Sequence, residues 1–191
     1  MNLDECSARE QPLSGVRVLL VDDDVGGRDA LYVALESRGA DVVAVGTAGE
    51  ALAAFEAAQP DILLSDLAIS GEDGCELLKR VRRRDLARGG GVSAAAVTAL
   101  DTPEDHMRAS EAGFQLHVAK PVEPDYIVAL VALLAGRFAE LDDLLEELQT
   151  RSARHAVLSR RFHALQAERE RLVRESHALR AAARSLRNDR M

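Results

Sequence analysis

The stretch VRVLLVDDD at residues 16–24 runs from a β-rich apolar segment directly into three adjacent carboxylates. Neighbouring carboxylates repel, and each prefers water to the edge of a protein core. The apolar segment is one of five that have the character of β-strands. Several are apolar continuously rather than alternately, which is typical of parallel strands covered on both faces. The expected strands are Val16–Val21, Asp41–Val45, Asp61–Ser65, Val92–Val97 and Gln115–Val118.

Helical patterns separate these strands, at residues 26–38, 47–58, 73–84, 103–112 and 123–135. Two of them have start signals. The run Thr47–Glu50 fits a capping box, and Thr102-Pro103 offers an N-cap followed by Pro at the first helical position. Gly39 and Gly113 stand where helix ends need a left-handed residue. The alternation of strands and helices predicts an open, doubly wound, five-stranded parallel α/β sheet.

The composition excludes several other classes of protein. Of the 191 residues, 47% are apolar and 3% aromatic, so the core must be aliphatic. Cys6 and Cys75 lie far apart without His or Cys neighbours, which argues against a disulfide framework and structural zinc. Apolar runs such as 127–135 are too short to span a bilayer, and residues 1–15 lack the apolar core of a signal peptide. We therefore expect a cytoplasmic protein with no membrane segment.

The charge is distributed unevenly along the chain. Residues 151–191 hold 11 Arg and 4 acidic residues, a balance of +7 in a chain whose net charge is −8. An acidic body and a basic tail indicate regions with different roles. We expect a flexible leader at 1–14, one domain at 15–136 and a basic helical extension at 137–191.

The extension has the pattern of a coiled coil. It contains no Pro or Gly, and leucines recur every seven residues at 158, 165, 172, 179 and 186. A stripe this long exceeds what one small domain can cover, so we expect a homodimer through residues 137–191. The alternative is one amphipathic helix folded back on its own domain. Nucleic acid is a weaker alternative partner, because the Arg residues are spread around the helix rather than massed in a basic region.

Side chains suited to chemistry stand where the expected strands end. Asp22-Asp23-Asp24 follows the first strand, Asp66 ends the third, Thr98 the fourth and Lys120 the fifth. In sheets of this class, ligands bind beyond the carboxyl ends of the strands. With the strand order 2-1-3-4-5 these four strands are consecutive neighbours. The carboxylates, the hydroxyl and the ammonium therefore converge on one crevice.

This set of groups suits a phosphoryl group. Clustered carboxylates repel unless a cation neutralises them, and an oxygen-only site favours Mg²⁺. With its charge shielded, one carboxylate can attack a phosphoryl donor and form an acyl phosphate. A Lys ammonium and a Thr hydroxyl can each contact a phosphoryl oxygen. A Mg²⁺-dependent phosphatase is the rival interpretation, but the chain shows neither a pocket-building second domain nor an evident general acid.

Residues 14–136 resemble the response-regulator receiver domain of two-component signalling. The matching segments are VRVLLVDDD (16–24), DILLSDLAISGEDGCELLKRVR (61–82), AAVTAL (95–100) and AGFQLHVAKPVEP (112–124). The resemblance implies a flavodoxin-like fold and a signalling switch rather than an enzyme acting on other molecules. It also implies phosphorylation by a histidine kinase or a phosphotransfer protein, and output through protein–protein contacts.

The resemblance assigns roles in the crevice. It makes Asp66 the phosphoacceptor, and Asp22 and Asp23 the acid pair for Mg²⁺. In the family the second acid of the pair usually binds the metal directly, and the first acts largely through water. Ala68 would lend its backbone carbonyl to the metal, and Lys120 would contact the phosphoryl group.

Further positions match the family or depart from it. Thr98 is the switch hydroxyl, and Lys120-Pro121 is the usual cis peptide, which is plausible only because Pro follows. His117 stands where the family often has a Tyr or Phe that rotates with the switch. We expect His117 to be a surface side chain or a contact residue rather than a pH sensor. Ser70 replaces a common Pro, which predicts a less rigid loop.

Three smaller expectations concern the rim of the crevice and the core. Asp24 is expected to be a solvated cap of the first helix rather than a metal ligand. Gly26-Gly27 weakens the start of that helix. Cys75 is expected to be a small packing residue.

Overall fold

The computed structural model describes residues 11–86, 91–138, 140, 141 and 144. The chain divides into two compact units, residues 1–144 and 145–191, and the described residues belong to the first. Leu141 and Leu144 are buried, so the first unit extends past the boundary expected at residue 136. The heptad leucines from residue 158 onward lie outside the described residues, and the coiled coil therefore stays a prediction.

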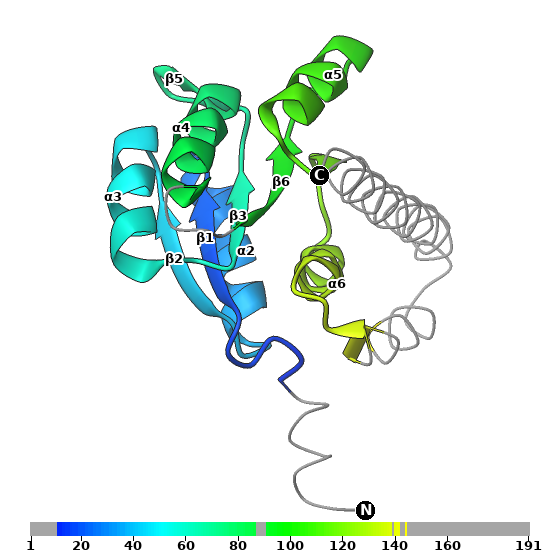
Figure 1. Cartoon of the computed structure of the whole chain (residues 1–191). Coiled ribbons are helices and arrows are strands. Elements are labelled where there is room, and N and C mark those ends of the chain that lie inside the picture. The colour runs from blue at the N-terminus through cyan, green and yellow to red at the C-terminus, as the bar shows by residue number, and fades with distance from the viewer. Residues whose placement is uncertain (1–10, 87–90, 139, 142–143, 145–191) are drawn as a thin grey trace, which may run out of the picture. The chain divides into compact units, whose positions relative to one another are not determined.

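The first unit is built on a five-stranded parallel sheet (Figure 1). Its strands are β1 (Arg17–Val21), β2 (Asp41–Val45), β3 (Ile62–Ser65), β6 (Ser93–Thr98) and β7 (Leu116–Ala119). They follow the order β2-β1-β3-β6-β7, and each neighbouring pair is parallel. Counted within this sheet alone, the order is the expected 2-1-3-4-5. The doubly wound, flavodoxin-like fold is thus confirmed.

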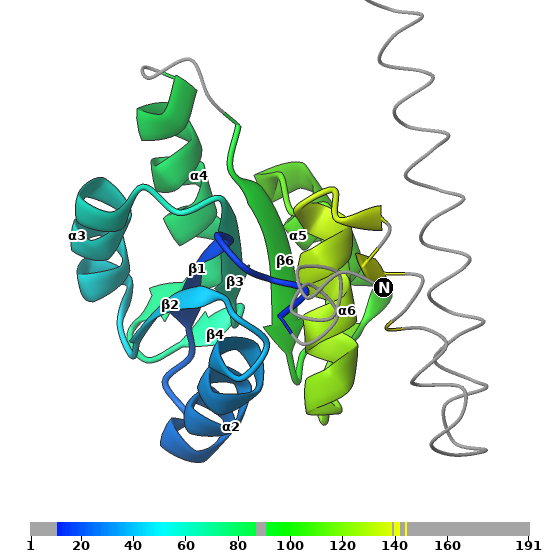
Figure 2. The ribbon, with the colours of Figure 1, turned by 90° about the horizontal axis from the view of Figure 1, so that it is seen from below.

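Helices cover both faces of the sheet (Figure 2). They are α2 (Val25–Glu36), α3 (Ala48–Ala58), α4 (Gly74–Leu86), α5 (Pro103–Ala112) and α6 (Pro124–Leu134). α2 packs beside α6 on one face, while α3, α4 and α5 pack in a row on the other. Because both faces are covered, the consecutive residues Leu63 and Leu64 of β3 are both fully buried. No helix in the described part of the chain is both long and apolar enough to span a membrane.

The helix-end signals act largely as expected. Thr102 caps α5, and its hydroxyl accepts from the N–H of Asp105 while the Asp105 carboxylate accepts from the Thr102 N–H. Gly113 ends α5 in the left-handed conformation with φ 103°. At α3 the capping box is altered, because Glu50 accepts from the N–H of Gly46 instead of that of Thr47.

Two parts of the fold differ from the expectations. The leader expected at 1–14 ends earlier, since Leu13 is fully buried and its N–H donates to the Arg38 carbonyl at 2.9 Å. The chain after β3 also forms a small antiparallel hairpin, β4 (Ala68–Ile69) with β5 (Glu72–Asp73). Gly71 turns this hairpin with φ 79°. Two-residue strands carry no periodic pattern, so the sequence gives no sign of them.

Candidate functional site

The carboxyl ends of β1, β3, β6 and β7 meet at one edge of the sheet. Asp22 directly follows β1, Asp66 directly follows β3, and Lys120 directly follows β7. Thr98 is the last residue of β6. Because these strands are parallel neighbours, residues far apart in the sequence come together at this edge.

Lys120 joins the carboxylates of two different strands. Its Nζ donates to Asp22 Oδ2 at 2.6 Å and to Asp66 Oδ2 at 2.8 Å. Burial of Lys120 favours its neutral form, but the hydrogen bonds to Asp22 and Asp66 outweigh it and raise the pKa of Lys120. The side chain therefore stays charged. The peptide bond from Lys120 to Pro121 is cis.

Asp66 is buried at the carboxyl end of β3. It is 7% exposed, and its Oδ1 accepts from the Ala68 N–H at 2.9 Å while Oδ2 faces Lys120. Gly74 at the start of α4 makes this loop possible, because a Cβ there would lie 2.2 Å from the Asp66 carbonyl oxygen. Sequence reasoning missed Gly74, although the Asp73-Gly74 pair at the start of a helical pattern was a usable turn signal.

A cluster of oxygen donors, here called the carboxylate pocket, lies at this edge of the sheet. Asp22, Asp23 and Asp66 each offer a carboxylate oxygen within 4.8 Å of the others. Three carboxylates face the single ammonium of Lys120, so their repulsion is only partly offset. A small hard cation bound by oxygen fits such a donor set, and Mg²⁺ is the ion that this chemistry favours. The residues present therefore fit the metal that the fold family implies.

Asp23 is held by the hairpin that follows Asp66. Its Oδ2 accepts from the Ser70 hydroxyl at 2.7 Å and from the Ser70 N–H at 3.0 Å. The hydroxyl bond is the main cause that lowers the pKa of Asp23. A Pro at position 70 would donate neither hydrogen bond. Ser70 thus connects this loop to the acid pair. The sequence predicts only that a Ser in place of Pro makes the loop less rigid.

Ser70→Ala is expected to weaken Mg²⁺ binding about tenfold, because loss of a partner that orients a metal ligand costs about 10–100-fold in affinity. Isothermal titration calorimetry of the metal-free protein measures the change. Ser37→Ala is the matched control, since the Ser37 hydroxyl bonds to the Ala34 carbonyl at the far end of α2. Tighter binding by Ser70→Ala would contradict this role and show that Ser70 competes with the metal for Asp23.

Asp24 is not one of the three clustered carboxylates, and it acts as a helix cap, as expected. It is exposed and forms the N-cap of α2, where its Oδ2 accepts from the Gly27 N–H at 2.9 Å. A Cβ on Gly27 would lie 2.7 Å from that oxygen. Gly27 therefore permits the close approach of the cap, a benefit that partly offsets its low helix propensity.

The two positions expected to form the switch, Thr98 and His117, lie in the neighbouring strands β6 and β7. Thr98 is fully buried, and its hydroxyl accepts from the Leu100 N–H at 3.2 Å. His117 lies opposite Ala96 in the β6–β7 register, with a side chain that is 7% exposed. It is a contact residue and not a surface one, because its ring stacks on His106 at 3.8 Å between centroids. Burial lowers the pKa of His117.

Residues 18–132 match the family model of the response regulator receiver domain. A protein of Leptolyngbya boryana described as uncharacterized is 40% identical over 63% of this chain and 91% of its own length. The transcriptional regulatory protein TrcR of Mycobacterium tuberculosis is 31% identical over 70% of this chain and 51% of its own. The DNA-binding response regulator MtrA of Mycolicibacterium smegmatis is 34% identical over 60% and 48%. The chain thus spans about half the length of these two regulators.

Solved structures show the same fold. A CheY-like receiver domain protein of Methanospirillum hungatei is 30% identical with a TM-score of 0.56, over 65% of this chain and 98% of its own. The chemotaxis protein CheY4 of Vibrio cholerae has a TM-score of 0.58 at 24% identity, over 62% and 98%. The chain belongs to the response regulator receiver domain family, the signalling switches of two-component systems.

Proposed function

We propose that this protein is a phosphorylation-activated switch, in which Asp66 accepts a phosphoryl group from a histidine kinase or a phosphotransfer protein. The observation that supports this most directly is that Asp66 bonds to Lys120 and lies in one cluster with Asp22 and Asp23 at the carboxyl end of the sheet. We expect a small phosphodonor to label the protein in Mg²⁺ and not in a chelator. Equal labelling in both would count against the proposal.

In the proposed reaction, an Asp66 oxygen attacks phosphorus and the bond from phosphorus to the donor breaks, which leaves an acyl phosphate. Bound Mg²⁺, held by Asp22, Asp23, Asp66 and the Ala68 carbonyl, would supply charge neutralisation for the incoming group. Lys120 already bonds to Asp66 and stays charged, so its ammonium is available to hold a phosphoryl oxygen. In this proposal Asp22 and Asp23 would act as ligands only, whereas Asp66 would also act as the nucleophile.

The proposed output depends on the β6–β7 end of the pocket. A phosphoryl group on Asp66 offers acceptor oxygens that the Thr98 hydroxyl can reach by leaving its bond to the Leu100 N–H. This exchange would alter the loop before α5 and repack the surface of α5, β7 and α6. A partner that binds the two arrangements with different affinity then responds to phosphorylation.

The basic extension gives the proposal a second element. We infer that residues 137–191 form a homodimer through the leucine repeat. In analytical ultracentrifugation at tens of micromolar, the full chain is expected to sediment as a dimer, and a chain ending at residue 144, where the first unit ends, as a monomer. Monomers in both samples would contradict dimerisation through the extension.

Nucleic-acid binding by the extension is the second candidate. It is favoured by the 11 Arg of residues 151–191 and by relatives that are described as DNA-binding. If it holds, the logarithm of affinity for duplex DNA falls steeply with the logarithm of salt concentration. The absence of DNA binding at low salt would leave dimerisation as the proposed role.

A further inference from the structure

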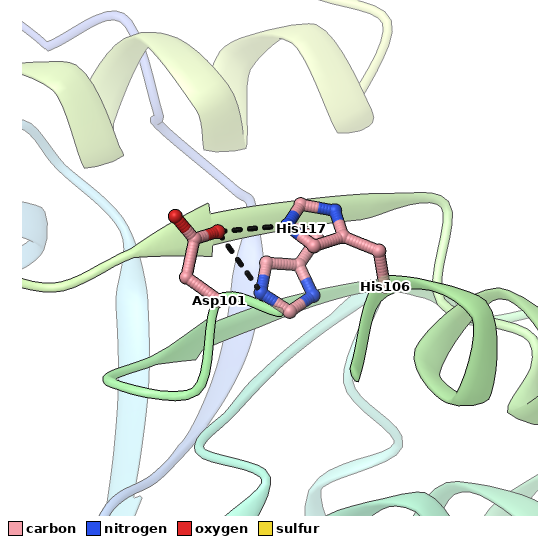
Figure 3. Close-up of side chains that lie close together, drawn as sticks. All are labelled: Asp101, His106 and His117. Atoms are coloured by element: carbon pink, nitrogen blue, oxygen red, sulfur yellow. Dashed lines mark hydrogen bonds and ion pairs between the residues drawn. The ribbon is translucent and has the colours of Figure 1, made fainter. Parts of the chain in front are cut away.

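A second cluster of metal-ligating side chains lies outside the carboxylate pocket (Figure 3). Asp101 is in the loop after β6, His106 is in α5 and His117 is in β7, and each offers one donor atom within 4.8 Å of the others. We propose that these three side chains bind a divalent transition-metal ion such as Zn²⁺. The site itself does not depend on the phosphorylation of Asp66.

The distances suit a single ion. Asp101 Oδ1 lies 2.7 Å from His106 Nε2 and 3.8 Å from His117 Nε2. Zn²⁺ binds imidazole nitrogen and carboxylate oxygen at about 2.0–2.2 Å, so the ligand atoms of a tetrahedral site are about 3.4 Å apart. The two observed distances lie on either side of that value. The spacing of the three donor atoms is therefore close to what a single ion requires.

One ring has to turn before both can bind. The two imidazoles stack at 17° between their planes, and a coordinated ion lies close to the plane of each ring, so the stacked pair cannot both aim at one ion. The side chain of His106 is 43% exposed, whereas that of His117 is 7% exposed. Rotation about the second side-chain torsion of His is soft. His106 is therefore the ring that turns, while the backbone of α5 stays in place.

The donor chemistry distinguishes this cluster from the acidic pocket. Two imidazoles and one carboxylate suit Zn²⁺, Ni²⁺ or Cu²⁺, whereas the oxygen-only pocket suits Mg²⁺. A His must be neutral to bind a metal, and burial favours the neutral form of His117. The two sites would therefore select different ions from the same solution.

The surroundings of His117 decide which of its nitrogens would bind the ion. Its Nδ1 is buried and makes no hydrogen bond within the described residues, while its Nε2 contacts the Leu100 carbonyl at 2.8 Å. Nε2 also lies 3.8 Å from the Asp101 carboxylate, so it is the nitrogen that would coordinate the ion.

A bound ion would connect the cluster to the switch region. Leu100 donates its N–H to the Thr98 hydroxyl and offers its carbonyl to His117. Coordination by His117 Nε2 would replace the contact with the Leu100 carbonyl and fix the loop, α5 and β7 to one another. An influence of the metal on Thr98 rests on the proposed function, whereas the binding of the metal does not.

The test is a calorimetric titration of the full chain with Zn²⁺, in excess Mg²⁺ so that the carboxylate pocket is already filled. We expect wild type to bind Zn²⁺ and His106→Gln to weaken that binding by more than about tenfold. Loss of a residue that only supports a ligand costs at least about tenfold in metal affinity, and His106 is a proposed ligand. The matched control is His163→Gln, which lies in residues 145–191 and should bind as wild type does.

A second measurement identifies the nitrogens involved. In the ¹⁵N-labelled protein, the imidazole signals of His106 and His117 are expected to shift first as Zn²⁺ is added, and Asp101→Asn should reduce those shifts. The proposal is overturned if wild type does not bind Zn²⁺. It is equally overturned if His106→Gln binds as tightly as wild type, or if only histidines of residues 145–191 respond. Failure of phosphorylation at Asp66 would leave these results unchanged.

Discussion

Asp66→Asn is expected to abolish phosphoryl incorporation from a small phosphodonor in Mg²⁺. An acyl phosphate needs a carboxylate oxygen as nucleophile, and the amide of Asn cannot supply one. Asn has the shape of Asp, and its single side-chain oxygen can still accept from either Lys120 or the Ala68 N–H, so the fold should persist. Labelling with a radioactive donor measures the loss, and circular dichroism verifies folding.

The matched control for this variant is Asp24→Asn. Asp24 is a carboxylate at the rim of the same pocket, but it is exposed and caps α2. Its replacement should leave labelling close to the wild-type level, with at most a small loss of helix stability. Undiminished labelling of Asp66→Asn would refute the assignment of the phosphoacceptor.

The second large effect is on metal binding by the acids after β1. Asp23→Ala is expected to weaken Mg²⁺ binding by more than about tenfold. Loss of a partner that only orients a ligand already costs about 10–100-fold in metal affinity, and this variant removes the expected ligand itself. Asp22→Ala should weaken binding less, since we expect this acid to act largely through water, and Asp24→Ala should change it little. Calorimetric titration of the three variants gives the order.

Stability has to be measured beside affinity in this series. Asp22 is 2% exposed and bonds to Lys120, so its removal leaves that ammonium with Asp66 as its remaining carboxylate partner in the pocket. We expect Asp22→Ala to lower the melting temperature in the absence of Mg²⁺, and Asp24→Ala to do so only slightly. An equal loss of Mg²⁺ affinity in Asp24→Ala and Asp23→Ala would contradict the division of roles among the three acids.

Much of the fold was predictable because its central strands, β1, β3 and β6, are buried on both faces. Apolar runs located all five strands of the sheet, and the helix and strand bounds agree with the structure to within two residues. What could not be predicted depends on tertiary contacts. Leu13 is fully buried, although it lies in a short segment without a helix or strand pattern. The β4–β5 hairpin is too short to leave a pattern.

The candidate site also has a part that the sequence predicts and a part that depends on tertiary contacts. Asp22, Asp66 and Lys120 could be brought together from the sequence, because the ends of neighbouring parallel strands must meet. The contact of Ser70 with Asp23 joins residues 47 positions apart through a loop conformation that no local pattern specifies. The stacking of His106 on His117 likewise depends on how α5 packs on β7.

The central claim is that one phosphoryl group is carried by Asp66, and locating that group tests it most directly. After reaction with a small phosphodonor in Mg²⁺, the wild-type protein is digested and its peptides are sequenced by mass spectrometry. We expect a single acyl phosphate, on Asp66, that is absent when a chelator replaces Mg²⁺. A phosphoryl group on another residue, or one that forms equally well in the chelator, would contradict the account.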